Sequence, residues 1–171
     1  MNVYIKSLIY LMIFSILHFG YDLTHWAFLI PLCGINESVF QHLKMVFWAY
    51  FLVNLVEYFV IKRKVSERKT FWYPKLLSTI IIPWIVMIIW YFVPVLFGRV
   101  ESLVLNVSWS VFSTYSSGVI VGIIEKNIEK NLFTSNFKMV ILILIIVSAF
   151  LYVWFTYKPP WIDLFINPEI L

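Results

Sequence analysis

Five long runs of apolar residues dominate the chain, and short polar segments separate them. An α-helix needs about 20 largely apolar residues to cross the hydrocarbon core of a bilayer. The pattern therefore predicts spans at residues 8–30, 43–61, 76–97, 103–124 and 139–157, with no charge inside the last. We expect an all-α, polytopic membrane helix bundle that forms a single domain over residues 1–171, with residues 158–171 as a short tail outside the membrane.

The composition supports a membrane protein. The chain is 62% hydrophobic and 13% charged, with a mean hydropathy of +0.89, which leaves too little polar surface to cover a water-soluble globule of 171 residues. The lipid bilayer is therefore the expected surroundings, and we expect a multi-pass protein of the cell membrane. The short loops leave no room for a soluble domain.

The basic residues predict an orientation, because cytoplasmic loops retain lysine and arginine. Of the 13 basic residues, ten fall on one side of the predicted bundle: Lys6, Lys62, Arg63, Lys64, Arg68, Lys69, Lys75, Lys126, Lys130 and Lys138. The other three are Lys44, Arg99 and Lys158. This bias predicts a cytoplasmic N-terminus and an outer C-terminus. The net charge of +4 then reflects topology, and we expect no nucleic-acid partner.

All three histidines lie in one short stretch, together with two carboxylates: His18, Asp22, His25, Glu37 and His42. Ionisable groups at membrane depth are costly, so this cluster is the best candidate for a functional site. His18, Asp22 and His25 are spaced i, i+4, i+7, which places them within roughly 60° of one helix face. We expect this stripe to face the bundle interior, in the outer half of the membrane.

The chain turns after span 1 and returns through the segment 36–44, with Asn36 as the expected N-cap of the next helix. This return brings Glu37 and His42 back to the outer end of span 1. They are five residues apart, about 140° around a helix, so Glu37 would have to reach the cluster from the first turn. Asp163 and Asn167 in the tail are expected to fold over the cluster.

The return segment reads Asn-Glu-Ser-Val-Phe-Gln-His-Leu-Lys, and His-Phe-x-Tyr-Asp precedes it in span 1. It resembles a family of small, uncharacterised prokaryotic multi-pass membrane proteins with the signature Asn-Glu-Ser-x-Trp-Glu-His-Leu-Lys. The tail segment 163–168 is similar to that family's closing Leu-Phe-x-Asp-Pro. The resemblance brings no established activity with it. This chain differs from the signature at Phe40, where the family has Trp, and at Gln41, where it has Glu.

One interpretation of the cluster is a metal-dependent membrane hydrolase. His18, Asp22, His25 and His42 are the candidate ligands of Zn²⁺, because neutral imidazole and carboxylate are common zinc ligands. Glu37 is the expected general base, with Asp22 as a second catalytic candidate. The substrate would be a lipid or another membrane-borne ester or amide.

Two other interpretations remain open. Ionisable groups in mid-membrane also suit a small transporter or a proton-coupled subunit. A buried His-Asp network can instead be structural and fix the register of the helices, with no catalytic site. Haem ligation by His18 and His42 is a further alternative.

Two features of the spans predict packing. Span 4 carries small residues at every fourth position, at Ser110, Thr114, Gly118 and Gly122, which favours close approach of another helix. This seam could serve a homo-oligomer or a partner membrane subunit. Glu57, near the cytoplasmic end of span 2, is expected to extend toward Lys62 or Arg63.

Overall fold

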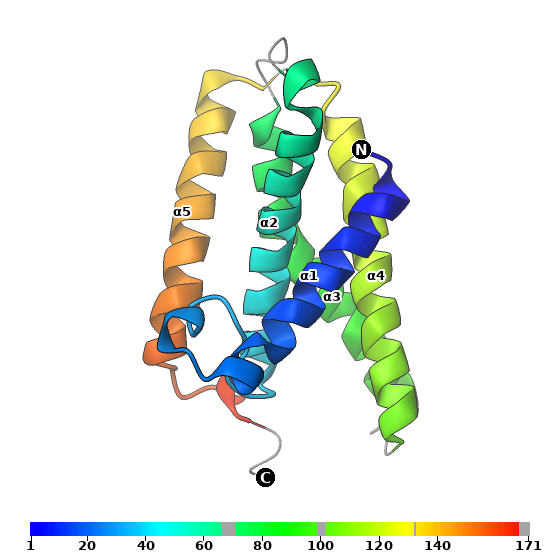
Figure 1. Cartoon of the computed structure of the whole chain (residues 1–171), viewed down its shortest axis with the longest axis vertical. Helices are drawn as coiled ribbons and strands as arrows, with labels where there is room; N and C mark the ends of the chain where they lie inside the picture. Colours follow the sequence, from blue (N-terminus) through cyan, green and yellow to red (C-terminus); the bar gives the residue numbers. More distant parts are fainter. Residues whose placement is uncertain (66–70, 99–101, 132, 168–171) are drawn as a thin grey trace.

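The structure is a computed structural model that describes residues 1–65, 71–98, 102–131 and 133–167, with the backbone alone at residues 61–65. It contains five α-helices, α1 (Val3–Thr24), α2 (Val39–Val65), α3 (Trp72–Phe97), α4 (Leu103–Ile128) and α5 (Ser135–Tyr157) (Figure 1). Two 3₁₀ turns, η1 (Ala27–Leu29) and η2 (Asp163–Phe165), lie in the connection after α1 and in the tail. The predicted basic residues Arg68, Lys69 and Arg99 lie outside the described residues.

All five helices are long and apolar enough to cross a membrane, over Val3–Thr24, Val39–Val60, Trp72–Phe97, Leu103–Ile128 and Ser135–Tyr157. The prediction of an all-α fold with five helices of spanning length is therefore confirmed. Many large apolar side chains point outward, which fits contact with lipid. The start of α1 and the tail turn η2 lie at opposite ends of the bundle (Figure 1). The side of the membrane on which each end lies remains a prediction.

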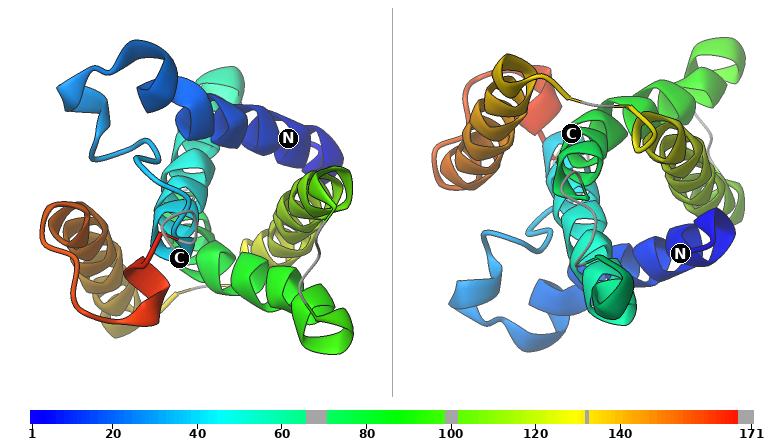
Figure 2. Two further views of the ribbon diagram at one scale, coloured as in Figure 1. Left: turned by 90° about the horizontal axis from the view of Figure 1, so that it is seen from below. Right: turned by 90° about the horizontal axis from the view of Figure 1, so that it is seen from above.

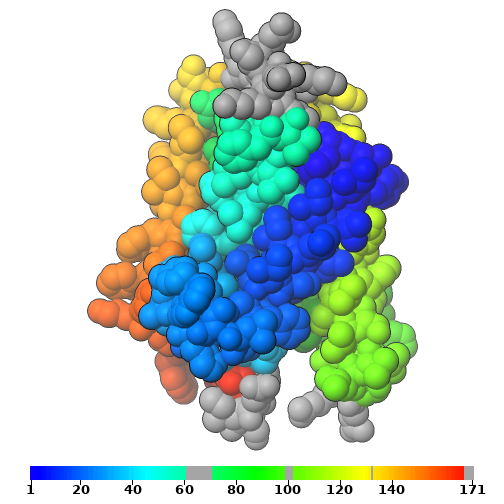
Figure 3. All heavy atoms as spheres, viewed as in Figure 1, coloured from blue at the N-terminus to red at the C-terminus, as the bar shows by residue number. Residues whose placement is uncertain are grey.

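Helices α1 to α4 form a ring in which each helix packs on its neighbours, and α5 lies outside the ring against α3 (Figure 2). Buried side chains from all four ring helices meet in the core, including Tyr10, Tyr50, Ile82 and Val121. The connection between α1 and α2 covers the lower part of one face of the molecule (Figure 3). This connection carries the predicted site.

The first helix differs most from its predicted span, because it covers Val3–Thr24 and not residues 8–30. His25 caps the helix with φ at 54°, in the left-handed region, and its backbone N–H donates to the Tyr21 carbonyl. This conformation cannot continue an α-helix. The apolar residues after His25 form η1 instead, so hydrophobicity alone placed the end of this helix too late.

The four-residue repeat of α4 packs against α1 of the same chain at two glycines. A Cβ atom on Gly118 would lie 2.9 Å from a ring carbon of Tyr10, and one on Gly122 would lie 2.8 Å from a methyl group of Val3. Only glycine allows so close an approach of the two helices. The predicted interhelical seam is therefore present within the chain, while its use by a second copy or a partner subunit stays a prediction.

Candidate metal site between α1 and α2

Three of the predicted side chains converge near the C-terminal end of α1. His18 lies on α1, Glu37 lies in the connection, and His42 lies in the first turns of α2. The Nε2 atoms of His18 and His42 lie 3.7 Å and 3.4 Å from the two carboxylate oxygens of Glu37. One ligand atom from each of the three residues lies within 4.8 Å of the others. Among the described residues, these three side chains form a group that could hold a metal ion.

The connection is fixed to both helices, which explains how Glu37 reaches the histidines. The Gly34 N–H donates to the Leu17 carbonyl at 3.2 Å, so the returning chain lies beside α1 one residue before His18. A Cβ atom on Gly34 would lie 2.8 Å from the sulfur of Met45, so the connection packs closely on α2 at this crossing. Buried Lys44 donates to the Ile30 carbonyl at 2.8 Å and holds the middle of the connection.

The start of α2 corrects the predicted helix cap. Asn36 was expected as the N-cap, but α2 begins at Val39 and its cap is Ser38. The Ser38 hydroxyl accepts from the Gln41 N–H at 3.4 Å, while the Asn36 side chain accepts from the Ser38 N–H in a tight turn. In the sequence, Ser38 and Gln41 have the Ser-x-x-Gln spacing of a capping box, which could have identified this cap. Glu37 therefore precedes the helix, and the 140° helical separation from His42 does not apply.

Ser38 also orients His42. The Nδ1 atom of His42 lies 3.0 Å from the Ser38 carbonyl oxygen, which can only accept a hydrogen bond, so Nδ1 carries the proton. In a neutral ring this leaves a lone pair on Nε2, the atom that faces Glu37. Metal-bound histidines are commonly held in this way by a carbonyl on the other ring nitrogen.

His18 lies in an aromatic environment. Its ring stacks on Phe14, meets Phe19 edge-on with ring centroids 4.7 Å apart, and lies 5.4 Å from the His42 ring. Its Nδ1 atom is buried and has no hydrogen-bond partner among the described residues. The ring is thus held by packing, and its Nε2 atom is presented to Glu37.

The Glu37 carboxylate is adapted to remain charged. It is 40% exposed at the side chain, and contact with His42 lowers the pKa of this carboxyl, although partial burial opposes the shift. His18 lowers the pKa of the same carboxyl through its charge. An ionised carboxylate beside two imidazoles is a suitable ligand set for a divalent metal ion.

Asp22 and His25 do not join this group. Both are exposed, Asp22 one turn beyond His18 on α1 and His25 at the C-cap, where its Nδ1 atom lies 3.2 Å from the Tyr21 carbonyl oxygen. The prediction that the whole stripe faces the interior is therefore wrong for these two residues: Asp22 is exposed in the last turn of α1, and His25 lies at the left-handed cap where the helix ends. Their roles as ligands or catalyst stay predictions.

The tail reaches the start of α2 through an aromatic contact. Phe165 stacks on Phe40 with ring centroids 4.4 Å apart, and Phe40 also contacts Tyr152 of α5. The tail thus lies next to the residues that precede His42. The predicted covering role of Asp163 and Asn167 stays a prediction, and Pro168 lies outside the described residues.

Cys33 is buried in the core beside Gly20, whose added Cβ would lie 3.1 Å from the sulfur. Burial raises the pKa of the thiol, so it is a poor nucleophile and a poor source of thiolate. It does not belong to the metal-ligating group. Cys33 therefore serves packing, as a small hydrophobic side chain does.

The sequence reasoning missed a buried network of charges at the opposite end of the bundle. Lys6 of α1 and Lys75 of α3 each form ion pairs with Glu57 of α2 and Glu125 of α4, and Lys75 also pairs with Glu129. Glu57 was expected to extend toward Lys62 or Arg63, whose side chains lie outside the described residues. Its carboxylate is buried and pairs with Lys6 and Lys75. Lys6 and Lys75 had been counted among the residues of the connections. The feature of the sequence that could have indicated the network is Glu57, a carboxylate inside an apolar run.

Comparisons with known proteins give one match. Neither the curated proteins nor the solved structures contain a match to this chain. A comparison with protein families matches residues 2–169 to a family of unknown function, DUF6512. The resemblance to an uncharacterised family is confirmed at that level, while the Asn-Glu-Ser-x-Trp-Glu-His-Leu-Lys signature and the prokaryotic origin stay predictions. The chain, with its five helices of spanning length, belongs to the DUF6512 family.

Proposed function

We propose that the protein is a metal-binding membrane protein that holds Zn²⁺ on His18, Glu37 and His42 and uses it for hydrolysis. The observation that carries this proposal is the convergence of one ligand atom from each residue within 4.8 Å. Two ligands of a tetrahedral zinc ion with bonds of about 2.0–2.1 Å lie about 3.4 Å apart. The observed separations, 3.7 Å from His18 to one oxygen of Glu37 and 3.4 Å from His42 to the other, are close to this spacing.

The hydrogen bonding of His42 supports a cation at this point. With its proton on Nδ1, a neutral His42 turns a lone pair toward the Glu37 carboxylate, which is itself an acceptor. Two acceptors at this separation repel each other unless a proton or a metal ion lies between them. A second imidazole from His18 on the same carboxylate favours a metal ion, because it completes a set of three ligands.

The ligand set leaves room for catalysis. Three protein ligands on zinc leave a fourth position for a water molecule, whose pKa zinc lowers to about 7. In this arrangement Glu37 is a ligand and not the general base that the sequence suggested. Asp22, exposed one turn beyond His18, is then the candidate base.

The surroundings of the site suggest a membrane-borne substrate. Trp26 and Phe28 in the connection are exposed and stack with ring centroids 5.4 Å apart. Exposed aromatic rings near the end of a spanning helix are typical of the membrane interface. An ester or amide of a lipid or of another membrane-bound molecule is therefore the proposed substrate class.

Metal content of the purified protein tests the proposal. We expect about one equivalent of zinc in the wild-type protein, and its loss in His18→Ala, Glu37→Ala and His42→Ala. His25→Ala is the matched control, since it removes an imidazole from the same region and should retain the metal. Wild-type protein without metal, whose thermal stability does not change with added zinc or with chelator, would overturn the proposal.

Hydrolysis requires a separate assay. Zinc-loaded protein in lipid vesicles should release product from a membrane-borne ester or amide, and Asp22→Asn should slow this reaction while the bound zinc remains. Retained zinc without any such turnover in a panel of lipid substrates would leave a metal-binding protein and exclude the hydrolase.

The buried charges favour proton-coupled transport as a second candidate function. Lys6, Glu57, Lys75 and Glu125 are ionisable groups inside spanning helices, where such groups often mark ion pathways. Transport predicts a pH-dependent flux in protein-containing liposomes that Glu125→Gln abolishes. Equal flux in protein-free liposomes would exclude it.

A further inference from the structure

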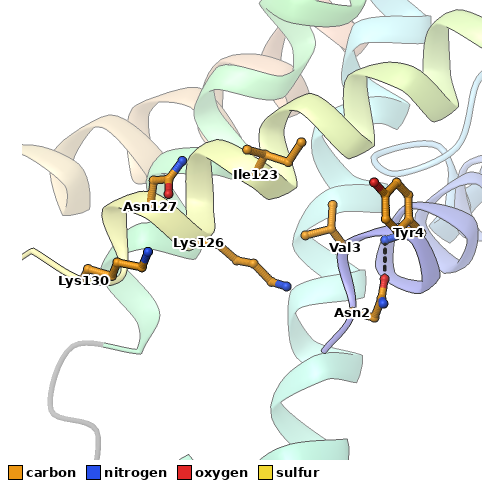
Figure 4. A pocket seen from close by; sticks show the side chains of 7 residues that line it. All are labelled: Asn2, Val3, Tyr4, Ile123, Lys126, Asn127 and Lys130. Carbon is orange, nitrogen blue, oxygen red and sulfur yellow. Dashed lines mark hydrogen bonds between the residues drawn. The ribbon is translucent and has the colours of Figure 1, made fainter.

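A basic cavity lies at the other end of the bundle from the candidate metal site. It occupies about 330 Å³ between the first turn of α1 and the last turns of α4. Lys126 and Asn127 of α4 line it together with Lys130, two residues after the end of that helix, and Asn2, the N-cap of α1, lines the other side (Figure 4). This volume is at the small end of the ~300–1,000 Å³ that ligand cavities usually occupy.

The two lysines carry positive charge that no neighbouring carboxylate balances. The nearby acids Glu57, Glu125 and Glu129 are all ion-paired with Lys6 or Lys75. Glu129 lines an adjoining cavity of about 540 Å³ that shares both free lysines. Within the part of the chain that the structure describes, neither Lys126 nor Lys130 forms an ion pair.

The amino end of α1 adds to the positive potential. Asn2 caps this helix, and its side chain accepts from the Tyr4 N–H at 2.9 Å (Figure 4). The first turn of a helix carries a partial positive charge from its unpaired N–H groups. Two lysines, two asparagine side chains and this helix end together suit an anion with several oxygen acceptors.

We propose that this cavity binds the phosphate of an anionic phospholipid headgroup. The cavity wall also contains Tyr4 and Ile123, which are 62% and 49% exposed. One turn farther along the same faces, Leu8 and Ile120 are exposed as well. This apolar strip would receive the acyl chains of a lipid whose phosphate lies between the lysines, whereas free phosphate would make no use of it.

The position in the bundle agrees with this ligand. Basic pockets between spanning helices bind anionic headgroups on the cytoplasmic side, and this end is the predicted cytoplasmic end. Gly122 of α4 packs against Val3, which lines the cavity. The site thus lies where two helices pack against each other.

Lipid binding to the purified full-length protein tests the proposal. Phosphatidylglycerol is titrated into protein in a neutral detergent, with phosphatidylcholine as the neutral lipid, and bound lipid is counted by native mass spectrometry. We expect Lys126→Gln/Lys130→Gln to weaken phosphatidylglycerol binding by about thirtyfold. Lys126→Arg/Lys130→Arg should restore it.

A control pair removes the same charge elsewhere. Lys138→Gln/Lys158→Gln should leave the affinity for phosphatidylglycerol unchanged, since these lysines lie over the rings of Tyr73 and Trp154 and not in the cavity. Equal losses in both pairs would overturn the proposal, as would equal binding of the neutral lipid. Displacement of the lipid by millimolar inorganic phosphate would show that the ligand is free phosphate.

Discussion

The Lys75 ammonium group lies 2.7 Å from the Glu125 carboxylate, although the two residues are 50 positions apart and on different helices. Both side chains are buried, and Lys6 and Glu57 complete a closed set of ion pairs around them. Tyr50 adds a hydrogen bond to the other oxygen of Glu125. The network therefore joins α1, α2, α3 and α4 at one end of the bundle.

Removal of one member of this network should destabilise the protein strongly. Lys75→Met leaves the Glu125 carboxylate buried with Lys6 as its remaining ion-pair partner, and such a loss typically costs about 3–5 kcal/mol. Thermal unfolding in detergent, followed by tryptophan fluorescence, measures the effect. Lys126→Met is the control, because this lysine is exposed and lies outside the network.

The double variant distinguishes a charge effect from a packing effect. Lys75→Met/Glu125→Met removes both charges, so it should be less destabilised than the sum of the two single variants. Additive losses would show that the two side chains do not interact. A Lys75→Met variant as stable as Lys126→Met would contradict the buried network altogether.

The sequence predicted the number of helices because five apolar runs of spanning length leave few alternatives. It could not predict which charges pair, since Lys6, Glu57, Lys75 and Glu125 are distant in sequence and meet only when the ring of four helices closes. Lys6 and Lys75 were therefore counted only as basic residues on one side of the bundle. The pairing is a property of tertiary structure.

The sequence predicted one cluster of five residues, and the structure brings only three of them together. His18, Glu37 and His42 come together because Gly34 and Ser38 set the path of the return segment, and such backbone details do not follow from helical periodicity. His25 was grouped with His18 on the assumption that the helix continues. Its left-handed backbone conformation breaks that assumption.

The two glycines of α4 should differ in their tolerance of alanine. A Cβ on Gly118 would contact the ring of Tyr10, which is fully buried against Tyr50, whereas a Cβ on Gly122 would contact a methyl group of Val3 in the first turn of α1. Gly118→Ala should therefore be less stable than Gly122→Ala by about 1–3 kcal/mol. The gain in helix propensity is the same at both positions and cancels in this comparison.

Thermal unfolding of the two variants side by side gives this difference. The Tyr10 ring has little room to move, while the start of α1 can shift slightly away from α4. Equal stability of the two variants would mean that α1 and α4 do not approach as closely at Gly118 as the structure has them.

The tail should depend on the contact between Phe40 and Phe165. Their stacked rings hold η2 against the start of α2, and an aromatic pair of this kind contributes about 0.5–1.5 kcal/mol beyond its buried area. Phe165→Ala should release the tail and make it more sensitive to limited cleavage by chymotrypsin after Trp161. Phe165→Leu keeps an apolar side chain and should give an intermediate result, while an unchanged cleavage rate in Phe165→Ala would contradict the contact.

Zinc affinity should fall as the pH decreases from about 7 to about 5. The pKa of the Glu37 carboxyl lies below its ordinary value because of His42, so this ligand stays ionised throughout that range. The protons that compete with zinc must then bind the imidazoles of His18 and His42. Where both imidazoles are protonated in the metal-free protein, two protons oppose each zinc ion, and the affinity should fall by up to about 100-fold per pH unit.

Competition with a zinc-sensitive dye in detergent at several pH values measures this slope. His42→Ala should bind zinc much more weakly and should also show a shallower pH dependence, because only one imidazole remains to compete. His25→Ala should retain both the affinity and the slope of the wild type, since His25 lies at the end of α1 outside the ligand group. A slope that all three proteins share would place the bound zinc on other residues, because only ligation by His18 and His42 links two imidazole protons to the release of one ion.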